Sequence, residues 1–330
     1  MARGEFELIE RYFRRPAEAQ RVHRTDVPLG IGDDAALLDV PAGWQLVAAL
    51  DALVEGRHFP AGCEPRSIGH RALAVNLSDL AAMGATPAWF LLSLTLPAAD
   101  EDFLAGFTGG MMALGDAHGV ALVGGDTTGG PLVAVVQALG LVPAGAALTR
   151  AGASPGDLVY VSGTPGDAAA GLRLLLDPAS GASIGETHRD SLLQRFMFPA
   201  PRVALGQSLL GLASACIDVS DGLAADAGRL AAASGCGLQL DMEQLPLSPA
   251  LQAFAGDAAA RRMALTGGED YELCFTIAPG RLPLLAAQLD NVKCQVTCIG
   301  SLVPGSGITV REQGRPVTLD LRGFDHFPAP

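Results

Sequence analysis

The spacing of apolar and polar positions predicts alternating strands and helices in the first half of the chain. Short apolar runs bounded by glycine, proline or acidic residues are typical of buried strands. They lie at residues 45–50, 89–96, 120–123 and 132–142. Apolar positions recur at helical spacing over residues 67–83 and 101–118, and residues 6–13 predict a short amphipathic helix. Gly84 follows residues 67–83 and suits the end of a helix.

The second half repeats this pattern after a change of composition. Residues 150–156 are rich in alanine, glycine, serine and proline, which predicts a domain boundary near Ala151. We expect strands at residues 158–162, 216–219, 271–277 and 295–299, and helices that end at residue 176 and before Pro199. A chain of 330 residues is long for one hydrophobic core. The prediction is an α/β protein of two domains, residues 1–150 and 151–330.

Composition and charge exclude several classes of protein. Residues 1–16 carry charges every few positions, and no apolar run approaches the roughly 18 residues that a membrane helix needs. We therefore expect no membrane span and a cytoplasmic location. The net charge of −13 disfavours a nucleic-acid partner, because a phosphate backbone would be repelled.

Lysine and cysteine usage narrows the chemistry further. Lys293 is the only lysine, which excludes the lysine of a P-loop, of a protein-kinase strand or of a Schiff base. Phosphate charge must then be neutralised by metal ions or arginine. The six cysteines include no CxxC pair, so we expect free thiols rather than a zinc site.

Acidic residues beside glycine, or at the ends of apolar runs, form the most informative pattern. They occur at residues 32–34, 51, 125–126, 218–222 and 267–270. A strand end projects its side chain into the crevice where α/β proteins bind ligands, and a neighbouring glycine lets an anion approach the backbone. Each such pair is also common turn chemistry, but their repetition favours a ligand site.

Asp79 is the most specific single candidate for a functional acidic residue. It lies on the predicted helix 67–83, whose other residues near it are almost all apolar, and Asn76 is three residues earlier on the same face. A buried carboxylate needs a cation or a hydrogen-bond network. A structural aspartate bonded to loop amides remains the alternative.

Converging carboxylates predict divalent cations. Two unit charges about 4 Å apart repel by roughly 4 kcal/mol at an effective dielectric of about 20, so an acidic site alone would expel a triphosphate. Magnesium suits oxygen ligands and completes its shell with substrate phosphates.

Two basic side chains are further candidates. Arg150 is either a contact to a phosphate or a surface arginine. His58 is either a contact to the substrate that accepts the phosphoryl group or a routine polar side chain. Residues 162–167 superficially resemble a phosphate loop, but without lysine they predict a plain turn.

Ordered motifs across the chain resemble the thiamine monophosphate kinase family. The motifs read, in order, GIGDDAA, DALVEGRHF, NLSDLAAMGA, VGGDTT, VSGTPGDAAAGL, IDVSDGL and TGGEDYEL, and the likeness runs from about residue 6 to residue 327. The resemblance implies an α/β (α+β), two-domain aminoimidazole ribonucleotide synthetase-like fold and a homodimer formed through the mixed sheet of the N-terminal domain. That domain would bind ATP and magnesium, and the C-terminal α/β domain would complete the active site.

The same resemblance implies an activity and a set of site residues. The enzyme would phosphorylate thiamine monophosphate to thiamine diphosphate with ATP, by direct transfer assisted by several magnesium ions, as the last step of thiamine diphosphate biosynthesis. The implied magnesium ligands are Asp34, Asp51, Asp79, Asp126, Asp218 and Asp221, of which all but Asp221 would also be catalytic. The implied ATP contacts are Gly125, Asp126, Arg150 and Ser220, and the implied acceptor contacts are His58, Glu269 and Phe324.

Two positions depart from the family pattern. Ala49 and Leu50 stand where the family usually has two threonines, and Phe324 stands in place of its C-terminal tryptophan. The first change removes hydroxyls near a metal site, and the second removes an indole N–H donor. A related enzyme using ATP on another acceptor, or a cation-binding protein without turnover, are the alternative functions.

Overall fold

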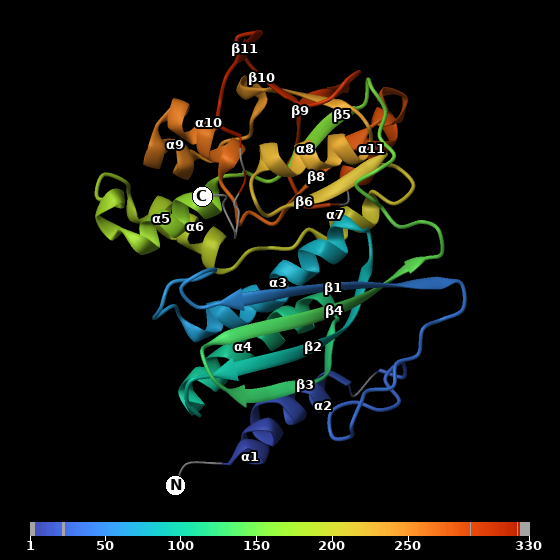
Figure 1. Cartoon of the computed structure of the whole chain (residues 1–330), viewed down its shortest axis with the longest axis vertical. Coiled ribbons are helices and arrows are strands. Elements are labelled where there is room, and N and C mark those ends of the chain that lie inside the picture. The colour runs from blue at the N-terminus through green and yellow to red at the C-terminus, as the bar shows by residue number, and fades with distance from the viewer. Residues whose placement is uncertain (1–3, 22–23, 291, 322, 324–330) are drawn as a thin grey trace. The chain divides into compact units, whose positions relative to one another are not determined.

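The computed structural model describes residues 4–21, 24–290, 292–321 and 323. The chain forms two compact units: Met1–Leu80 with Ala85–Gly145, and Ala81–Gly84 with Ala146–Pro330. Figure 1 shows helices and a sheet in each unit. Within the described ranges, no helix is long and apolar enough to cross a membrane. The described cysteines form no disulfide.

The first unit is a four-stranded mixed sheet covered by helices (Figure 1). Its elements in order are α1 (Glu5–Ile9), η1 (Glu10–Arg14), α2 (Arg15–Arg21), β1 (Trp44–Val54), α3 (Pro65–Ala82), β2 (Thr86–Leu96), α4 (Glu101–His118), β3 (Ala121–Gly129) and β4 (Val133–Pro143). The strand order is β1-β4-β2-β3. β4 pairs antiparallel with both β1 and β2, whereas β2 and β3 are parallel.

Close helix packing forms the core of the first unit. Leu73 and Leu77 of α3 are fully buried, as is Phe107 of α4. A β-carbon at Gly69 would lie 1.9 Å from the carbonyl oxygen of Phe107, so only glycine allows α3 and α4 to approach this closely. The packing fixes α3, and with it Asn76 and Asp79, beside the sheet.

The second unit contains a seven-stranded sheet of order β11-β10-β7-β9-β5-β8-β6. Its strands are β5 (Leu158–Ser162), β6 (Ala215–Val219), β7 (Gly237–Asp241), β8 (Glu272–Ile277), β9 (Val296–Val303), β10 (Ile308–Glu312) and β11 (Arg315–Val317). Only β7 and β10 pair in parallel; the other neighbours are antiparallel among the described strands.

Helices of the second unit pack in two groups. The helical elements are α5 (Asp167–Leu176), η2 (Pro178–Gly181), α6 (Glu186–Met197), α7 (Val203–Ser208), α8 (Leu223–Ala233), η3 (Met242–Gln244), α9 (Pro249–Ala255), α10 (Asp257–Thr266), η4 (Pro279–Arg281) and α11 (Leu282–Leu289). α8 packs its buried leucines against the sheet, and α5, α6, α9 and α10 share a second apolar cluster.

Three sequence predictions of local structure need correction. The N-terminal helical segment continues to Arg21 instead of ending near Phe13. β1 continues past Asp51 to Val54, and β3 runs through Gly125 and Asp126 to Gly129. Asp51 and Asp126 therefore lie inside strands, where the sequence pattern placed them at strand ends. The mixed α/β class of the two-unit chain is as predicted.

Candidate functional site

Asn76 joins helix α3 to strand β1 beside two candidate acids. Its Oδ1 accepts a hydrogen bond from the backbone N–H of Asp51 at 3.0 Å, and its Nδ2 donates to the carbonyl of Ala72 at 3.1 Å. Asn76 is fully buried. Asp79 is half-buried and lies one helical turn beyond Asn76, where Cβ atoms are about 5–6 Å apart. Asn76 thus brings Asp51 and Asp79 to one region.

His58 is held in the loop that follows β1. Its Nδ1 accepts from the N–H of Val54 at 3.0 Å, and its own N–H donates to the carbonyl of Val54 at 2.9 Å. An accepting Nδ1 assigns the ring hydrogen of the neutral imidazole to Nε2. The histidine is therefore fixed in orientation and tautomer near the end of the strand that carries Asp51.

Gly125 and Asp126 border a small pocket in the first unit. A β-carbon at Gly125, whose φ is 152°, would lie 1.9 Å from the carbonyl oxygen of Leu92, so this position requires glycine. The pocket has a volume of about 80 Å³, and its other walls are apolar side chains and backbone from Ile9, Phe13, Ile31, Leu92, Leu122, Gly124 and Thr127. Ile31 precedes Asp34 by three residues, so the loop carrying the exposed Asp34 passes this pocket.

The sheet register separates Asp51 from Asp126. Asp51 pairs with Val136, Val136 pairs with Leu92, and Leu92 pairs with Gly125, so one row of the sheet crosses from β1 to β3. β1 and β3 are the outer strands of this sheet. Three strand spacings amount to about 14 Å, which is too far for both carboxylates to bind one ion.

The described residues contain no group of three or more acidic, histidine or cysteine side chains placed to hold one metal ion. Oxygen donors are nevertheless present at separate positions of the first unit, with Asp51 and Asp79 near Asn76 and Asp126 beside its pocket. Carboxylate oxygens are the donors that magnesium prefers. This donor set fits several ions at distinct positions better than one shared ion.

In the second unit, Asp226 organises the loop that follows β6. Asp218 at the end of that strand is buried. The backbone N–H groups of Ser220 and Asp221 both donate to Oδ2 of Asp226 at 3.0 Å. Arg229 donates to Oδ1 of Asp226 at 2.5 Å and to Oδ2 of Asp221 at 2.6 Å. Asp221 is thus paired with an arginine, and any cation at this carboxylate has to compete with Arg229.

The segment 267–271 lies against this loop. The N–H of Glu269 donates to the carbonyl of Ser220, and the N–H of Tyr271 donates to the carbonyl of Val219, each at 2.8 Å. The hydroxyl of Tyr271 donates to Oε2 of Glu269 at 3.0 Å. Ser220 and Glu269, which are 49 positions apart in the chain by their numbers, are therefore neighbours.

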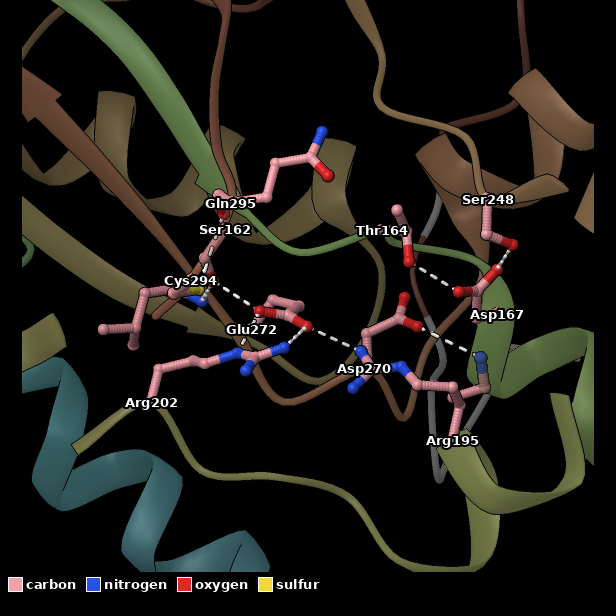
Figure 2. A network of polar contacts seen from close by, with 12 residues as sticks. Ser162, Thr164, Asp167, Arg195, Arg202, Ser248, Asp270, Glu272, Cys294 and Gln295 are labelled. Carbon is pink, nitrogen blue, oxygen red and sulfur yellow. Dashed lines mark hydrogen bonds and ion pairs between the residues drawn. The ribbon is translucent and has the colours of Figure 1, made fainter. Parts of the chain in front are cut away.

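Asp270 of this segment and Glu272, the first residue of β8, are buried in a polar network (Figure 2). Asp270 accepts from the N–H groups of Gly166 and Ala168 at 2.7 and 3.2 Å. Glu272 accepts from Arg202, Arg195 and Ser162. Burial raises the pKa of Asp270 to about 8 despite the charge of Arg195 and the two amides. Burial would also raise the pKa of Glu272, but the hydrogen bonds and charge of Arg202 outweigh it, and that pKa is lowered.

The turn at residues 162–167 is a plain turn, as predicted. The amides that a phosphate loop would offer to a ligand are those at the N-terminus of α5. Here the N–H groups of Gly166 and Ala168 already bind the carboxylate of Asp270. Thr164 also donates to Asp167 at 2.5 Å, which closes the turn on itself.

The remaining candidates lie in the second unit or outside the described residues. Arg150 is exposed, and its carbonyl accepts from the hydroxyl of Ser234 at 3.1 Å. Phe324 is outside the described residues. Its neighbour Gly323 lies against Asp221, because a β-carbon at Gly323 would be 3.1 Å from the carbonyl oxygen of that residue.

Sequence reasoning missed the residues that position the candidates. Asp226 and Arg229 bond to Asp221, and Tyr271 bonds to Glu269, but these residues and Asp270 were not singled out as site residues. Asp270 and Tyr271 belong to the motif TGGEDYEL, whose extra acid and tyrosine exceed what a turn needs, whereas Asp226 and Arg229 lie beyond IDVSDGL in helix α8. Spacing alone does not tell which acid of such a motif points inward.

Two family models cover most of the chain. Residues 32–142 match the N-terminal domain of the AIR synthase related proteins, and residues 154–313 match the C-terminal domain. A curated relative, the thiamine-monophosphate kinase of Salmonella typhimurium strain LT2, is 47% identical over 331 aligned residues, covering 100% of both chains.

Solved structures resemble the chain over nearly its whole length. The crystal structure of thiamine-monophosphate kinase from Stenotrophomonas maltophilia K279a is 46% identical, with a TM-score of 0.86 and coverage of 96% of this chain and 99% of that one. The structure of AaThiL complexed with AMPPCP and TMP is 33% identical, with a TM-score of 0.77 and coverage of 98% and 97%.

Proposed function

Because this chain belongs to the thiamine-monophosphate kinase family of AIR synthase related proteins, we propose that it phosphorylates thiamine monophosphate with ATP. The products are thiamine diphosphate and ADP, which makes this the last step of thiamine diphosphate formation. The observation that carries the proposal is the 47% identity over the full length of a thiamine-monophosphate kinase. The ATP analogue AMPPCP and TMP bound together in a structure at 33% identity support the same pair of substrates.

The reaction is a direct transfer between two phosphates. A terminal phosphate oxygen of thiamine monophosphate attacks the γ-phosphorus of ATP, and the bond between that phosphorus and the bridging oxygen of ADP breaks. The acceptor oxygen is a competent nucleophile once it is positioned, so the reaction needs no covalent enzyme intermediate. The catalytic task of the protein is to orient the two phosphates and to neutralise their charge.

Magnesium supplies that neutralisation when bound, and the carboxylates offer suitable donors. We assign Asp34, Asp51, Asp79, Asp126, Asp218 and Asp221 as ligands of several ions. The separation of Asp51 from Asp126 across the sheet supports more than one ion. We assign Gly125, Arg150 and Ser220 to ATP, with the pocket beside Gly125 as apolar support for the nucleotide, and His58, Glu269 and Phe324 to the acceptor.

Residues 1–150 are assigned to ATP and magnesium binding, and residues 151–330 to completing the active site. A homodimer through the first unit's sheet is supported by β1, an outer strand of that sheet. Its alternate residues Trp44, Leu46 and Leu50 are 41%, 48% and 61% exposed. An exposed apolar stripe on a long outer strand is a typical interaction surface. A cytoplasmic homodimer without nucleic-acid or membrane partners completes the proposal.

A direct assay tests the proposed function. Purified protein is incubated with magnesium, ATP and thiamine monophosphate, and thiamine diphosphate is quantified by fluorescence after oxidation to the thiochrome. We expect product formation that depends on all three components. Omission of magnesium and replacement of ATP by AMPPCP are the controls. Absence of thiamine diphosphate above the enzyme-free background would refute the kinase proposal.

A further inference from the structure

Two residues of the segment 267–271 have an unusual backbone. Glu269 has a φ of 71° and Tyr271 a φ of 50°, and both lie in the left-handed region that favours glycine. For L-residues this region costs about 1–2 kcal/mol each, and a bulky aromatic residue there is a genuine outlier. Such conformations persist only where the surroundings hold them, and they gather at functional sites.

Asp270, between these two residues, anchors the segment on one side. Its carboxylate is fully buried and accepts from the N–H groups of Gly166 and Ala168 at the start of α5 (Figure 2). The contact spans more than a hundred positions of the chain and fixes the backbone at Asp270 relative to α5.

Glu272 anchors the segment on the other side. It is fully buried, and Arg202 donates to both of its carboxylate oxygens at 2.5 and 2.6 Å while Arg195 adds a third contact at 2.6 Å. Charge-assisted bidentate pairs have strong directional preference. With Asp270 and Glu272 both fixed, the intervening Tyr271 has little freedom to leave its strained conformation.

The strained backbone conformation has one effect on the side chains of this segment. It brings the hydroxyl of Tyr271 to 3.0 Å from Oε2 of Glu269, although these residues are only two apart. Tyr271 is 7% exposed, so its ring is packed, whereas Glu269 is half-buried. The hydroxyl therefore orients a carboxylate that retains contact with solvent.

From this arrangement we propose that Tyr271 is a positioning residue, which orients the Glu269 carboxylate toward the positively charged ring system of the acceptor. The inference rests on the proposed function, since thiamine monophosphate carries a thiazolium cation. Tyr271 itself does not touch the acceptor. Its hydroxyl acts through Glu269, while Asp270 and Glu272 hold the backbone that makes this contact possible.

The conservative variant Tyr271→Phe tests the proposal, because it removes the hydroxyl and keeps the packed ring. We expect the KM for thiamine monophosphate to rise about tenfold, as for loss of a hydrogen bond to a charged group, with kcat and the KM for ATP within about twofold. Calorimetric titration with thiamine monophosphate should show the same loss of affinity without turnover. Tyr160→Phe, the same substitution in strand β5, is the matched control and should leave all parameters unchanged.

A double-mutant cycle separates this role from a structural one. Glu269→Gln should also raise the KM for thiamine monophosphate, and adding Tyr271→Phe to it should raise that KM no further. Multiplicative effects in the double variant, or an unchanged KM in Tyr271→Phe, would overturn the proposal while the wild-type enzyme remains active. Failure of the wild-type protein to form thiamine diphosphate is a different result and rejects the proposed function itself.

Discussion

Arg202 donates to both carboxylate oxygens of Glu272, from Nη2 to Oε1 at 2.5 Å and from Nε to Oε2 at 2.6 Å. Glu272 is completely buried, and the side chain of Arg202 is 20% exposed. Arg195 shares the same Oε1, so one carboxylate faces two guanidinium groups. Glu272 directly follows residues 267–271, which carry Glu269, so the network links the stability of the second unit to the geometry of a candidate acceptor contact.

Glu272→Gln should strongly destabilise the protein. The amide keeps the size of the side chain but leaves Arg195 and Arg202 without their common counter-charge, and breaking a buried pair in this way costs about 3–5 kcal/mol. Urea denaturation followed by circular dichroism measures the free energy of unfolding. Asp257→Asn, at an exposed acid of α10, is the matched control and should change it by less than about 0.5 kcal/mol. A loss no larger than the control's would show that the network contributes little to stability.

Asp270 should make stability fall as pH rises. Burial raises its pKa to about 8 from the usual 3.8, so the folded state binds this proton more tightly than the unfolded state does. The resulting stabilisation is complete below about pH 4 and is lost as pH increases through about 8. Asp270→Asn removes the titrating group.

The measurement is the free energy of unfolding of both proteins at a series of pH values. The wild-type value minus that of Asp270→Asn should decrease between about pH 5 and pH 8, by at most about 1.4 kcal/mol per pH unit. A difference that stays level or grows over this range contradicts the raised pKa.

Asp79→Asn should abolish phosphoryl transfer without unfolding the protein. Asp79 follows Asn76, which binds the backbone of Asp51, by one turn of α3. The amide of the variant retains the shape but not the charge that a magnesium ligand needs. We expect kcat to fall by at least about a hundredfold, with an unchanged circular dichroism spectrum. Asp190→Asn, at an exposed position of α6, is the control. Full activity of Asp79→Asn would remove this residue from the metal assignment.

Leu50→Glu should disrupt the proposed homodimer. Leu50 is 61% exposed on the outer strand β1, and a charge there opposes burial of the apolar stripe against a second copy. Light scattering coupled to size-exclusion chromatography gives the mass of each protein in solution. We expect a dimer for the wild type and for Leu176→Glu, an equally exposed leucine of α5, and a monomer for Leu50→Glu. A dimeric Leu50→Glu would place the interface elsewhere.

The sequence predicted helix α4 and strand β5 at their observed bounds because their apolar periodicity is uninterrupted. The sequence placed the end of β1 too early, because the acidic Asp51 interrupts an apolar pattern that resumes at Ala52. The sequence also misjudged the N-terminal helical segment, because the amphipathic spacing ends near Phe13 while the helix continues past Pro16 to Arg21. Pro16 falls in the first turn of α2, where proline lacks only an N–H that a helix start does not use.

The candidate site was predictable as a set of motifs but not as a geometry. Five acidic sites, beside glycines or at the ends of apolar runs, indicated metal chemistry, yet their distances depend on strand order, which places Asp51 and Asp126 on opposite outer strands. In TGGEDYEL the acids Glu269, Asp270 and Glu272 look equivalent in the sequence. The left-handed backbone at Glu269 and Tyr271 decides which of them is buried, and no local propensity favours that conformation for these residues.

The occupied amides at the start of α5 also bear on how this protein handles anions. Many nucleotide-binding folds receive a phosphate directly at a helix N-terminus. Here the carboxyl group of Asp270, a residue of the chain itself, accepts the hydrogen bonds of those amides. An incoming nucleotide therefore cannot bind its phosphates at the N-terminus of α5. Its affinity for the enzyme should depend on the free magnesium concentration and should fall when a chelator such as EDTA is added.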